Sequence, residues 1–288
     1  MKTSRPAKLA ASCCAIAFVF SATPPSAICA DGDSKPNRPP QGSQQSRNPR
    51  YEAEYQKRTF KGGGDAEVSY GWLTPLKAKA GEKYPLVICL HGAGGSVKAS
   101  AVLTRQPMRE QYPAFVMVPE ADRPFTWAKT EIIRRPGVEN MPEKLPVLIE
   151  AILSLIKTEA IDPARSYLTG QSRGGVGSWG AIAQHAELFA AAVPVCGAWK
   201  IEDVPKMIAV PVWAFHGEKD PTVPVKFSRD LTAAIKKAGG TAKYTEYPGV
   251  GHDSWTKAYD DAEMWKWLFA QRKGVAAAGA SPEKKSNP

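Results

Sequence analysis

Hydrophobic and polar positions along the chain predict strands and helices in alternation. Residues 85–90 and 115–118 are continuous apolar runs, as expected for strands buried on both faces of a parallel sheet. Between residues 145 and 156 the apolar positions follow helical spacing, which predicts an amphipathic helix. The same reasoning predicts strands at residues 166–168, 191–196, 208–215 and 243–247, and helices at residues 173–185, 228–238 and 255–271. This alternation predicts an α/β fold with one doubly wound, mostly parallel sheet flanked by helices.

Three other segments complete the predicted domain, which spans residues 51–273. Residues 52–75, with three consecutive glycines at 62–64, predict a β-hairpin or meander that leads into the sheet. Residues 122–140 are polar and contain proline, and they predict a long functional loop. Few residues separate Trp199 from the following strand, so we expect no large lid domain and an open site.

Composition at both ends of the chain differs from that of the predicted domain. Residues 1–30 combine a basic start, an apolar run and a small-residue exit, which is the pattern of a secretory signal peptide. Residues 31–50 and 274–288 contain few large apolar side chains, and we expect them to be a disordered linker and a disordered tail. The sequence therefore predicts an exported protein, periplasmic or extracellular, without a membrane-inserted segment.

The distribution of charge bears on possible partners, and the positions of the cysteines bear on possible disulfides. The formal net charge is +10, but much of it lies outside the predicted domain, in which basic and acidic residues are interspersed. No basic stripe with interleaved aromatic residues is visible, so the sequence gives little support to nucleic-acid binding. Cys89 and Cys196 lie in or beside apolar strands, where free thiols behave as small hydrophobic side chains. We expect no disulfide between them.

The motif with the clearest chemical meaning is Gly170-Gln171-Ser172-Arg173-Gly174, which follows a predicted strand and precedes a predicted helix. It has the Gly-x-Ser-x-Gly form of a nucleophile elbow, a sharp strand-to-helix turn that exposes one serine hydroxyl. The turn brings the positions two residues either side of the serine against neighbouring backbone, where glycine avoids a collision. The motif predicts Ser172 as a nucleophile.

A serine nucleophile requires a base and an acid that orients it. In the chain order typical of this elbow, the acid and then the histidine follow the serine. Of the four histidines, only His252 leaves room for an acid between itself and Ser172. We expect the acid to be Asp220, which follows a predicted strand, with Glu218 as its nearest competitor.

The remaining three histidines are expected to have roles other than that of the base. His91 precedes a glycine-rich turn and is expected to order that loop, while His185 is expected at the surface and His216 in a structural role. Backbone N–H groups after the nucleophile and after the first long parallel strand usually stabilise the developing oxyanion. We therefore predict the N–H groups of Arg173 and Ala93 as the oxyanion hole.

Four motif blocks together resemble those of α/β-hydrolase serine esterases. They are residues 90–95 (Leu-His-Gly-Ala-Gly-Gly), 170–175 (Gly-Gln-Ser-Arg-Gly-Gly), 216–220 (His-Gly-Glu-Lys-Asp) and 251–252 (Gly-His). The resemblance is strongest to phospholipase/carboxylesterases, dienelactone hydrolases and prolyl oligopeptidase-like proteins, and it covers about residues 51–273. It implies a serine hydrolase that works through an acyl-enzyme, with no metal and no organic cofactor. Arg173 departs from the pattern, because many relatives carry an apolar residue there.

We interpret the chain as an exported carboxylic ester hydrolase. One alternative is a serine peptidase of prolyl-oligopeptidase type, although such enzymes usually carry a propeller domain for which this chain lacks the length. The other is a binding protein on an inactive hydrolase fold, which the presence of serine, acid and histidine disfavours.

Three tryptophans fall in segments that follow strands, where ligands of open α/β sheets bind. We predict Trp127, Trp199 and Trp255 as substrate-binding residues that stack on a sugar or aryl ring, with Arg173 or Arg123 near an anionic group. On this reading the substrate is a small-molecule or polysaccharide-linked ester, acetyl or hydroxycinnamoyl, rather than a long-chain lipid. The alternative is that Trp199 and Trp255 pack the core. The oligomeric state is not predicted.

Overall fold

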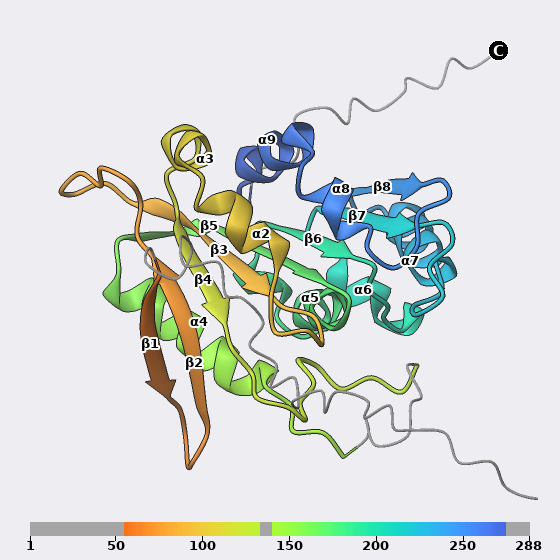
Figure 1. Cartoon of the computed structure of the whole chain (residues 1–288), viewed down its shortest axis with the longest axis horizontal. Helices are drawn as coiled ribbons and strands as arrows, with labels where there is room; N and C mark the ends of the chain where they lie inside the picture. Colours follow the sequence, from red (N-terminus) through yellow and green to blue (C-terminus); the bar gives the residue numbers. More distant parts are fainter. Residues whose placement is uncertain (1–54, 133–139, 275–288) are drawn as a thin grey trace, which may run out of the picture. The chain divides into compact units, whose positions relative to one another are not determined.

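A single sheet organises the residues that the structure describes. The computed structural model describes residues 55–132 and 140–274. Its strands are β1 (Gln56–Lys61), β2 (Glu67–Leu73), β3 (Tyr84–Leu90), β4 (Phe115–Pro119), β5 (Ile161–Gln171), β6 (Ala191–Val195), β7 (Val212–Gly217) and β8 (Ala242–Tyr247). Their order is β1-β2-β4-β3-β5-β6-β7-β8, with β1 and β8 at the two edges (Figure 1). Only the pairs β1–β2 and β2–β4 are antiparallel among these strands, which confirms the predicted mostly parallel sheet.

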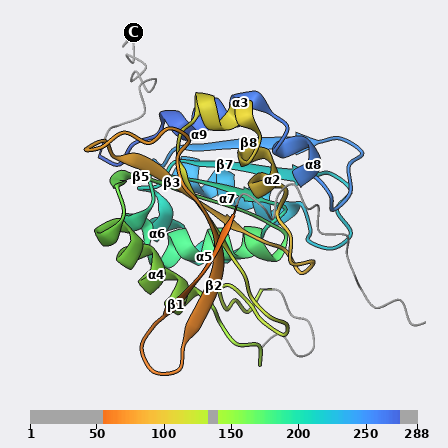
Figure 2. The same cartoon turned by 60° about the vertical axis from the view of Figure 1, so that its left-hand side comes forward.

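Helices cover both faces of this sheet. They are α2 (Lys98–Leu103), α3 (Gln106–Gln111), α4 (Leu145–Thr158), α5 (Arg173–Gln184), α6 (Val204–Met207), α7 (Lys226–Lys237), α8 (Trp255–Ala258) and α9 (Ala262–Ala270), with short 3₁₀ turns at Ala186–Leu188 and Ile201–Asp203. Figure 2 shows α4, α5 and α6 on one side of the sheet and α2, α3, α8 and α9 on the other. The fold is therefore a three-layer α/β/α arrangement.

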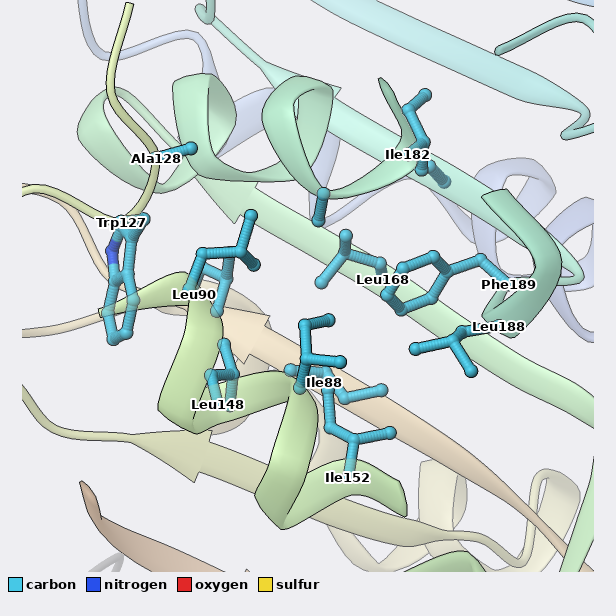
Figure 3. Close-up of a cluster of buried hydrophobic side chains, with 14 of the residues drawn as sticks. Ile88, Leu90, Trp127, Ala128, Leu148, Ile152, Leu168, Ile182, Leu188 and Phe189 are labelled. Carbon is cyan, nitrogen blue, oxygen red and sulfur yellow. The ribbon is translucent and has the colours of Figure 1, made fainter. Parts of the chain in front are cut away.

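The central strand β3 separates two hydrophobic cores. Ile88 and Leu90 point into the core beneath α4 and α5, where they meet Leu148 of α4 (Figure 3). Val87 and Cys89 point into the opposite core. Successive side chains of a strand face opposite sides, so a strand without polar positions is the expected sequence of one covered on both faces. Each large apolar side chain buried here contributes about 2 kcal/mol.

Several predicted elements have different bounds in the structure. The predicted helix at residues 255–271 is two helices, α8 and α9. Asp261, which precedes α9, has an extended backbone, and its carboxylate caps the new helix by accepting a hydrogen bond from Glu263 N at 2.9 Å. The strand predicted from residue 208 begins at Val212, after the short helix α6 and a turn. Helices α2 and α3 were not expected from the sequence. The predicted hairpin at residues 52–75 is the pair β1–β2.

Cys89 and Cys196 are free and buried. Cys89 lies in β3 and Cys196 directly follows β6, and β5 separates these two strands in the sheet. No helix in the described part of the chain is long and apolar enough to cross a membrane. The predicted signal peptide, linker and almost all of the predicted tail lie outside the described residues.

Candidate active site

Three of the predicted residues meet at the carboxyl edge of the parallel strands. Ser172 follows β5 directly, while Asp220 and His252 lie in the loops after β7 and β8. Ser172 Oγ lies 2.8 Å from His252 Nε2, and His252 Nδ1 lies 2.7 Å from Asp220 Oδ2. Residues that are 32 and 80 positions apart in the sequence thus form one continuous hydrogen-bonded row.

Ser172 occupies a strained turn between β5 and α5. Its φ is 56° and its ψ is −117°, a conformation that costs a residue with a side chain about 1–3 kcal/mol. The flanking glycines allow the turn: a Cβ added to Gly170 would lie 2.3 Å from Gly174 O, and one added to Gly174 would lie 2.0 Å from Leu90 O. Both contacts are with backbone atoms and cannot be relieved by a rotamer change. The close approach of α5 to β5 and β3 therefore lifts the serine hydroxyl above the sheet edge.

The hydrogen bonds of His252 assign its tautomer. Nδ1 faces a carboxylate, which can only accept a hydrogen bond when it is ionised. Nδ1 therefore carries the ring proton and donates a hydrogen bond to Asp220. Nε2 is then the acceptor for the Ser172 hydroxyl. The imidazole side chain is 21% exposed, while the Asp220 side chain is fully buried. This arrangement suits a base that receives the proton of the serine hydroxyl at Nε2.

Asp220 is held ionised by an unusually complete set of donors. Burial alone would raise the pKa of its carboxyl, but hydrogen bonds from His216, His252 and the backbone N–H groups of Val223 and Thr222 outweigh burial and hold the pKa well below its usual range. The two backbone donors lie 2.8 and 2.9 Å from Oδ1. The carboxylate is therefore negative wherever the neighbouring imidazole must carry a positive charge.

His216 is a fully buried support for this acid. Its Nε2 lies 2.9 Å from Val223 O and 3.2 Å from Asp220 Oδ2, and its Nδ1 lies 2.8 Å from Ser228 Oγ. Two acceptors face Nε2, so this nitrogen carries the proton and Nδ1 accepts from Ser228. The structure thus places His216 in contact with the candidate acid, while Glu218 is directed away and accepts from Gly249 N at 2.8 Å.

The other two histidines lie outside the row. His91 is buried, with Nδ1 2.7 Å from Gly92 O and Nε2 3.2 Å from Ala121 N, so it links the turn after β3 to the segment after β4. Burial is the main cause that lowers the pKa of His91, and the neutral ring fits both hydrogen bonds. His185 caps the end of α5, with Nδ1 3.7 Å from Glu187.

The predicted oxyanion loop lies against the serine. A Cβ added to Gly92 would be 3.4 Å from Ser172 Cβ and 3.3 Å from Gln171 O. Ala93, the next residue, is exposed, and Arg173 is the first residue of α5. The guanidinium of Arg173 lies 4.8 Å from the ring centroid of Phe125. Both predicted donors thus belong to segments next to Ser172.

The three predicted tryptophans do not share one role. Trp127 has no exposed surface, and its Nε1 donates to His91 O at 2.9 Å. Trp199 is only 3% exposed, and its Nε1 donates to Asp203 at 2.9 Å. The prediction that Trp127 and Trp199 offer stacking surfaces is therefore wrong: both rings fill the core under the site. Trp255 is half-buried and lies edge-on to His252, with ring centroids 5.3 Å apart.

Three contacts at the site were not expected from the sequence. Ser172 N donates to Val195 O at 3.0 Å and lies 3.3 Å from Cys196 Sγ. Cys196 Sγ, Asp220 and His252 offer ligand atoms within 4.8 Å of one another, a spacing that a metal ion could use. In the structure, however, the carboxylate and the imidazole already bind each other. Gln171 accepts from Lys98 N at 3.0 Å and so ties the elbow to the start of α2.

Comparisons with known proteins agree with this fold. The model of the dienelactone hydrolase family matches residues 73–266. Among solved structures, a thermostable esterase is 35% identical with a TM-score of 0.71, and the match covers 77% of this chain and 64% of that one, so the chain spans less than two thirds of that esterase.

Two other solved structures share the fold at low identity. A ferulic acid esterase is 15% identical with a TM-score of 0.56, covering 75% of this chain and 97% of that one. An acylaminoacyl peptidase of Pyrococcus horikoshii is also 15% identical with a TM-score of 0.57, covering 77% of this chain and 43% of that one. No match was found among curated proteins.

Proposed function

The chain belongs to the dienelactone hydrolase family of the α/β-hydrolase superfamily, and we propose that it hydrolyses carboxylic esters with Ser172 as nucleophile, His252 as base and Asp220 as orienting acid. The observation that carries this proposal is the continuous row of hydrogen bonds from Ser172 Oγ through His252 to Asp220, at 2.8 and 2.7 Å. A serine hydroxyl that donates to a neutral imidazole is the form in which it becomes nucleophilic.

The proposed reaction has two halves. Ser172 Oγ forms a bond to the ester carbonyl carbon while its proton passes to His252 Nε2, and Asp220 stabilises the resulting imidazolium. The C–O bond to the alcohol then breaks, and the leaving alkoxide takes the proton from His252. Water attacks the acyl-enzyme by the same route in reverse order, releasing the acid and regenerating Ser172.

The oxyanion of each tetrahedral intermediate is assigned to the N–H groups of Ala93 and Arg173. Support comes from the position of the Gly92 turn against Ser172 and of Arg173 at the start of α5. A preorganised donor of this kind contributes about 3 kcal/mol to transition-state stabilisation.

On the substrate, we infer an ester linked to a sugar or polysaccharide, acetyl or hydroxycinnamoyl. Of the predicted tryptophans, Trp255 alone is half-buried beside His252 and so has surface for a ring of the substrate. Such a substrate also fits an exported enzyme, which is the role proposed from residues 1–30.

A fluorophosphonate probe tests the nucleophile, and parallel assays test the bond that is cleaved. We expect the wild-type chain to be labelled and Ser172→Ala to be unlabelled, with kcat for p-nitrophenyl acetate lowered by about 10³-fold or more in the variant. Hydrolysis of peptide anilides with kcat/KM above that of esters would favour a peptidase instead. Absence of labelling and of hydrolysis in the wild type would contradict the enzyme proposal.

A further inference from the structure

A surface of partly exposed aromatic rings lies at the β7–β8 side of the sheet, and one end of it is close to the candidate site. It consists of Trp213 on β7, Tyr247 at the end of β8, Trp255 on α8 and Trp267 on α9, and we call it the aromatic surface. All four side chains lie at the margin of the core on the α8/α9 face of the sheet and are half-buried. The opposite face of β7 and β8 is covered by α7.

Three rings of the aromatic surface, Trp267, Trp213 and Tyr247, form a row through the buried Phe215. Trp267 and Trp213 are perpendicular with centroids 5.6 Å apart, and Trp213 stacks on the buried Phe215 at 5.2 Å. Phe215 in turn stacks on Tyr247 at 6.2 Å. Trp213 Nε1 donates to Thr245 Oγ1 at 3.0 Å, which fixes the indole on the sheet. The row is thus rigid, and its members hold one another in place.

Two lysine ammonium groups lie over this row. Lys243 Nζ is 4.5 Å from the centroid of Trp213 and 6.0 Å from that of Trp267. Lys257 Nζ is 5.6 Å from the centroid of Tyr247. Both lysines are exposed, and an ammonium group has three donors, of which an aromatic face uses only part. Each ammonium group therefore covers part of one ring face, on Trp213 or on Tyr247, and keeps donors for a ligand. In the described part of the chain, Trp255 and Trp267 have no lysine directly above them at less than 6.0 Å.

One end of the aromatic surface, formed by Tyr247 and Trp255, adjoins the candidate site. Tyr247 begins the loop that carries His252, and Val250 N donates to Tyr247 O at 3.2 Å. This loop packs on the end of β7, because a Cβ added to Gly217 would lie 2.1 Å from Gly251 O. Trp255, in the helix that follows this loop, lies edge-on to His252.

We propose that the aromatic surface binds the chain of a polysaccharide whose ester substituent is cleaved at Ser172. This inference rests on the proposed esterase function and extends it. A sugar ring has an apolar C–H face that fits an aromatic ring, and hydroxyl and carboxylate groups at its edge that accept from ammonium donors. Rigid rings bind with little loss of conformational entropy.

A second copy of this chain is the other occupant to consider. A two-fold interface centred on this surface would bring Lys243 and Lys257 close to the same residues of the other copy. Like charges that are desolvated together oppose association. Asp261, an acidic residue in the segment between α8 and α9, already caps α9. The charges therefore favour a glycan with carboxylates or hydroxyls over self-association.

The test compares polymer and small-ester hydrolysis in matched variants. Trp267→Ala and Tyr247→Ala remove rings of the aromatic surface, while Tyr244→Ala removes the same residue type from the α7 side of β8. The polymers are acetylated glucuronoxylan, feruloylated arabinoxylan and acetylated pectin, and the small ester is p-nitrophenyl acetate. For the polymer cleaved best by the wild type, we expect kcat/KM to fall about five- to tenfold in the two surface variants. In these two variants, kcat/KM for p-nitrophenyl acetate should stay within about twofold of the wild-type value. In Tyr244→Ala, kcat/KM for the polymer should also stay within about twofold of the wild-type value.

A binding measurement separates this inference from the esterase proposal. Ser172→Ala, which does not turn over, is run by affinity electrophoresis in gels that contain each polymer. We expect retardation by at least one of them, lost when Trp267→Ala or Lys243→Gln is added. Retardation without any ester hydrolysis by the wild type would overturn the esterase proposal and leave this surface supported.

Three results would overturn the inference. The first is wild-type hydrolysis of p-nitrophenyl acetate with neither retardation nor hydrolysis of any of the polymers. The second is an equal loss of polymer and small-ester activity in Trp267→Ala with an unchanged melting temperature. The third is a wild-type dimer that Trp267→Ala converts to a monomer, which would make this surface an interface between copies.

Discussion

At the scale of single residues, the candidate acid depends on a second histidine, His216, which contacts its carboxylate. Asp220 lies in the interior, where an isolated carboxylate would be protonated or strongly destabilising. His216, itself fully buried, faces the same carboxylate oxygen as His252, at 3.2 Å. Two imidazoles and two backbone N–H groups together replace the water that the carboxylate has lost.

The choice between the two acids of this loop gives a sharp prediction. Asp220→Asn keeps the shape of the side chain but removes its charge and permits the wrong imidazole tautomer, so we expect kcat to fall by about 10³- to 10⁴-fold. Glu218→Gln is the matched control, because Glu218 contacts Gly249 N and not His252. Steady-state kinetics on p-nitrophenyl acetate measure both. Full activity in Asp220→Asn together with a large loss in Glu218→Gln would reverse the assignment.

At the scale of elements, the site depends on how closely α5 approaches the central strands. Gly174, in the first turn of α5, faces Leu90 at the end of β3, and the same approach raises Ser172 above the sheet edge. A helix that packed one side chain further away would no longer hold the strained serine. Local strain at the nucleophile is thus supported by packing between elements that are distant in sequence.

Gly174→Ala tests this support. The added methyl would lie 2.0 Å from Leu90 O, so β3 and α5 must separate, and we expect the free energy of unfolding to fall by about 3 kcal/mol with loss of activity. Gly63→Ala is the control, since its Cβ would meet nothing within 4 Å. Urea unfolding of both variants gives the comparison. Equal stability of the two would show that the approach is not tight.

The anchoring of α9 gives a prediction on alkaline stability. Tyr167 on β5 donates to Gln271 O at 2.8 Å, just past the end of α9. Burial raises the pKa of Tyr167 to about 12, whereas tyrosine in an unfolded chain titrates near 10. The folded state therefore favours the neutral phenol, and this stability is complete below pH ~10 and lost as the pH rises from about 10 to about 12.

Tyr167→Phe removes the titrating group together with its hydrogen bond. At pH 8 we expect the variant to be less stable by about 1 kcal/mol, but its stability should fall less steeply above pH ~10 than that of the wild type. Urea midpoints at pH 8, 10 and 11 measure the slopes. Parallel slopes would show that Tyr167 ionises equally in both states.

At the scale of the whole molecule, we expect the predicted catalytic domain to fold and to keep its activity without the N-terminal fifty residues and without a disulfide. A chain that begins at residue 51 retains only Cys89 and Cys196, and burial raises the pKa of both thiols well above the usual range. Thiols that are neutral and inaccessible react slowly. The native chain should therefore resist a disulfide reagent that modifies both cysteines once guanidinium unfolds it.

Ellman's reagent and thermal unfolding check this prediction in the chain from residue 51. We expect activity on p-nitrophenyl acetate equal to that of the full chain, and a melting temperature that dithiothreitol does not change. Rapid modification in the native state would mean that a thiol is accessible. A lowered melting temperature in reductant would mean that a disulfide forms.

The sequence alone determined the features that depend on neighbouring residues. Apolar runs bounded by turns located the parallel strands, because a strand buried on both faces needs no polar positions. The glycines around Ser172 indicated the elbow, because the strain they relieve is local to that turn. Chain order then left His252 and Asp220 as the partners of Ser172.

Only the tertiary structure decided which distant surfaces meet. Trp127 and Trp199 follow strands as a binding residue would, yet packing against α5 and hydrogen bonds from their indoles bury both rings. The contact of His216 with Asp220 likewise depends on how the turn after β7 folds back on the end of that strand. A periodic pattern records whether a position is buried but not what covers it, because the covering residues come from elsewhere in the chain. Burial of an aromatic ring and support of a carboxylate are therefore properties of the assembled layers.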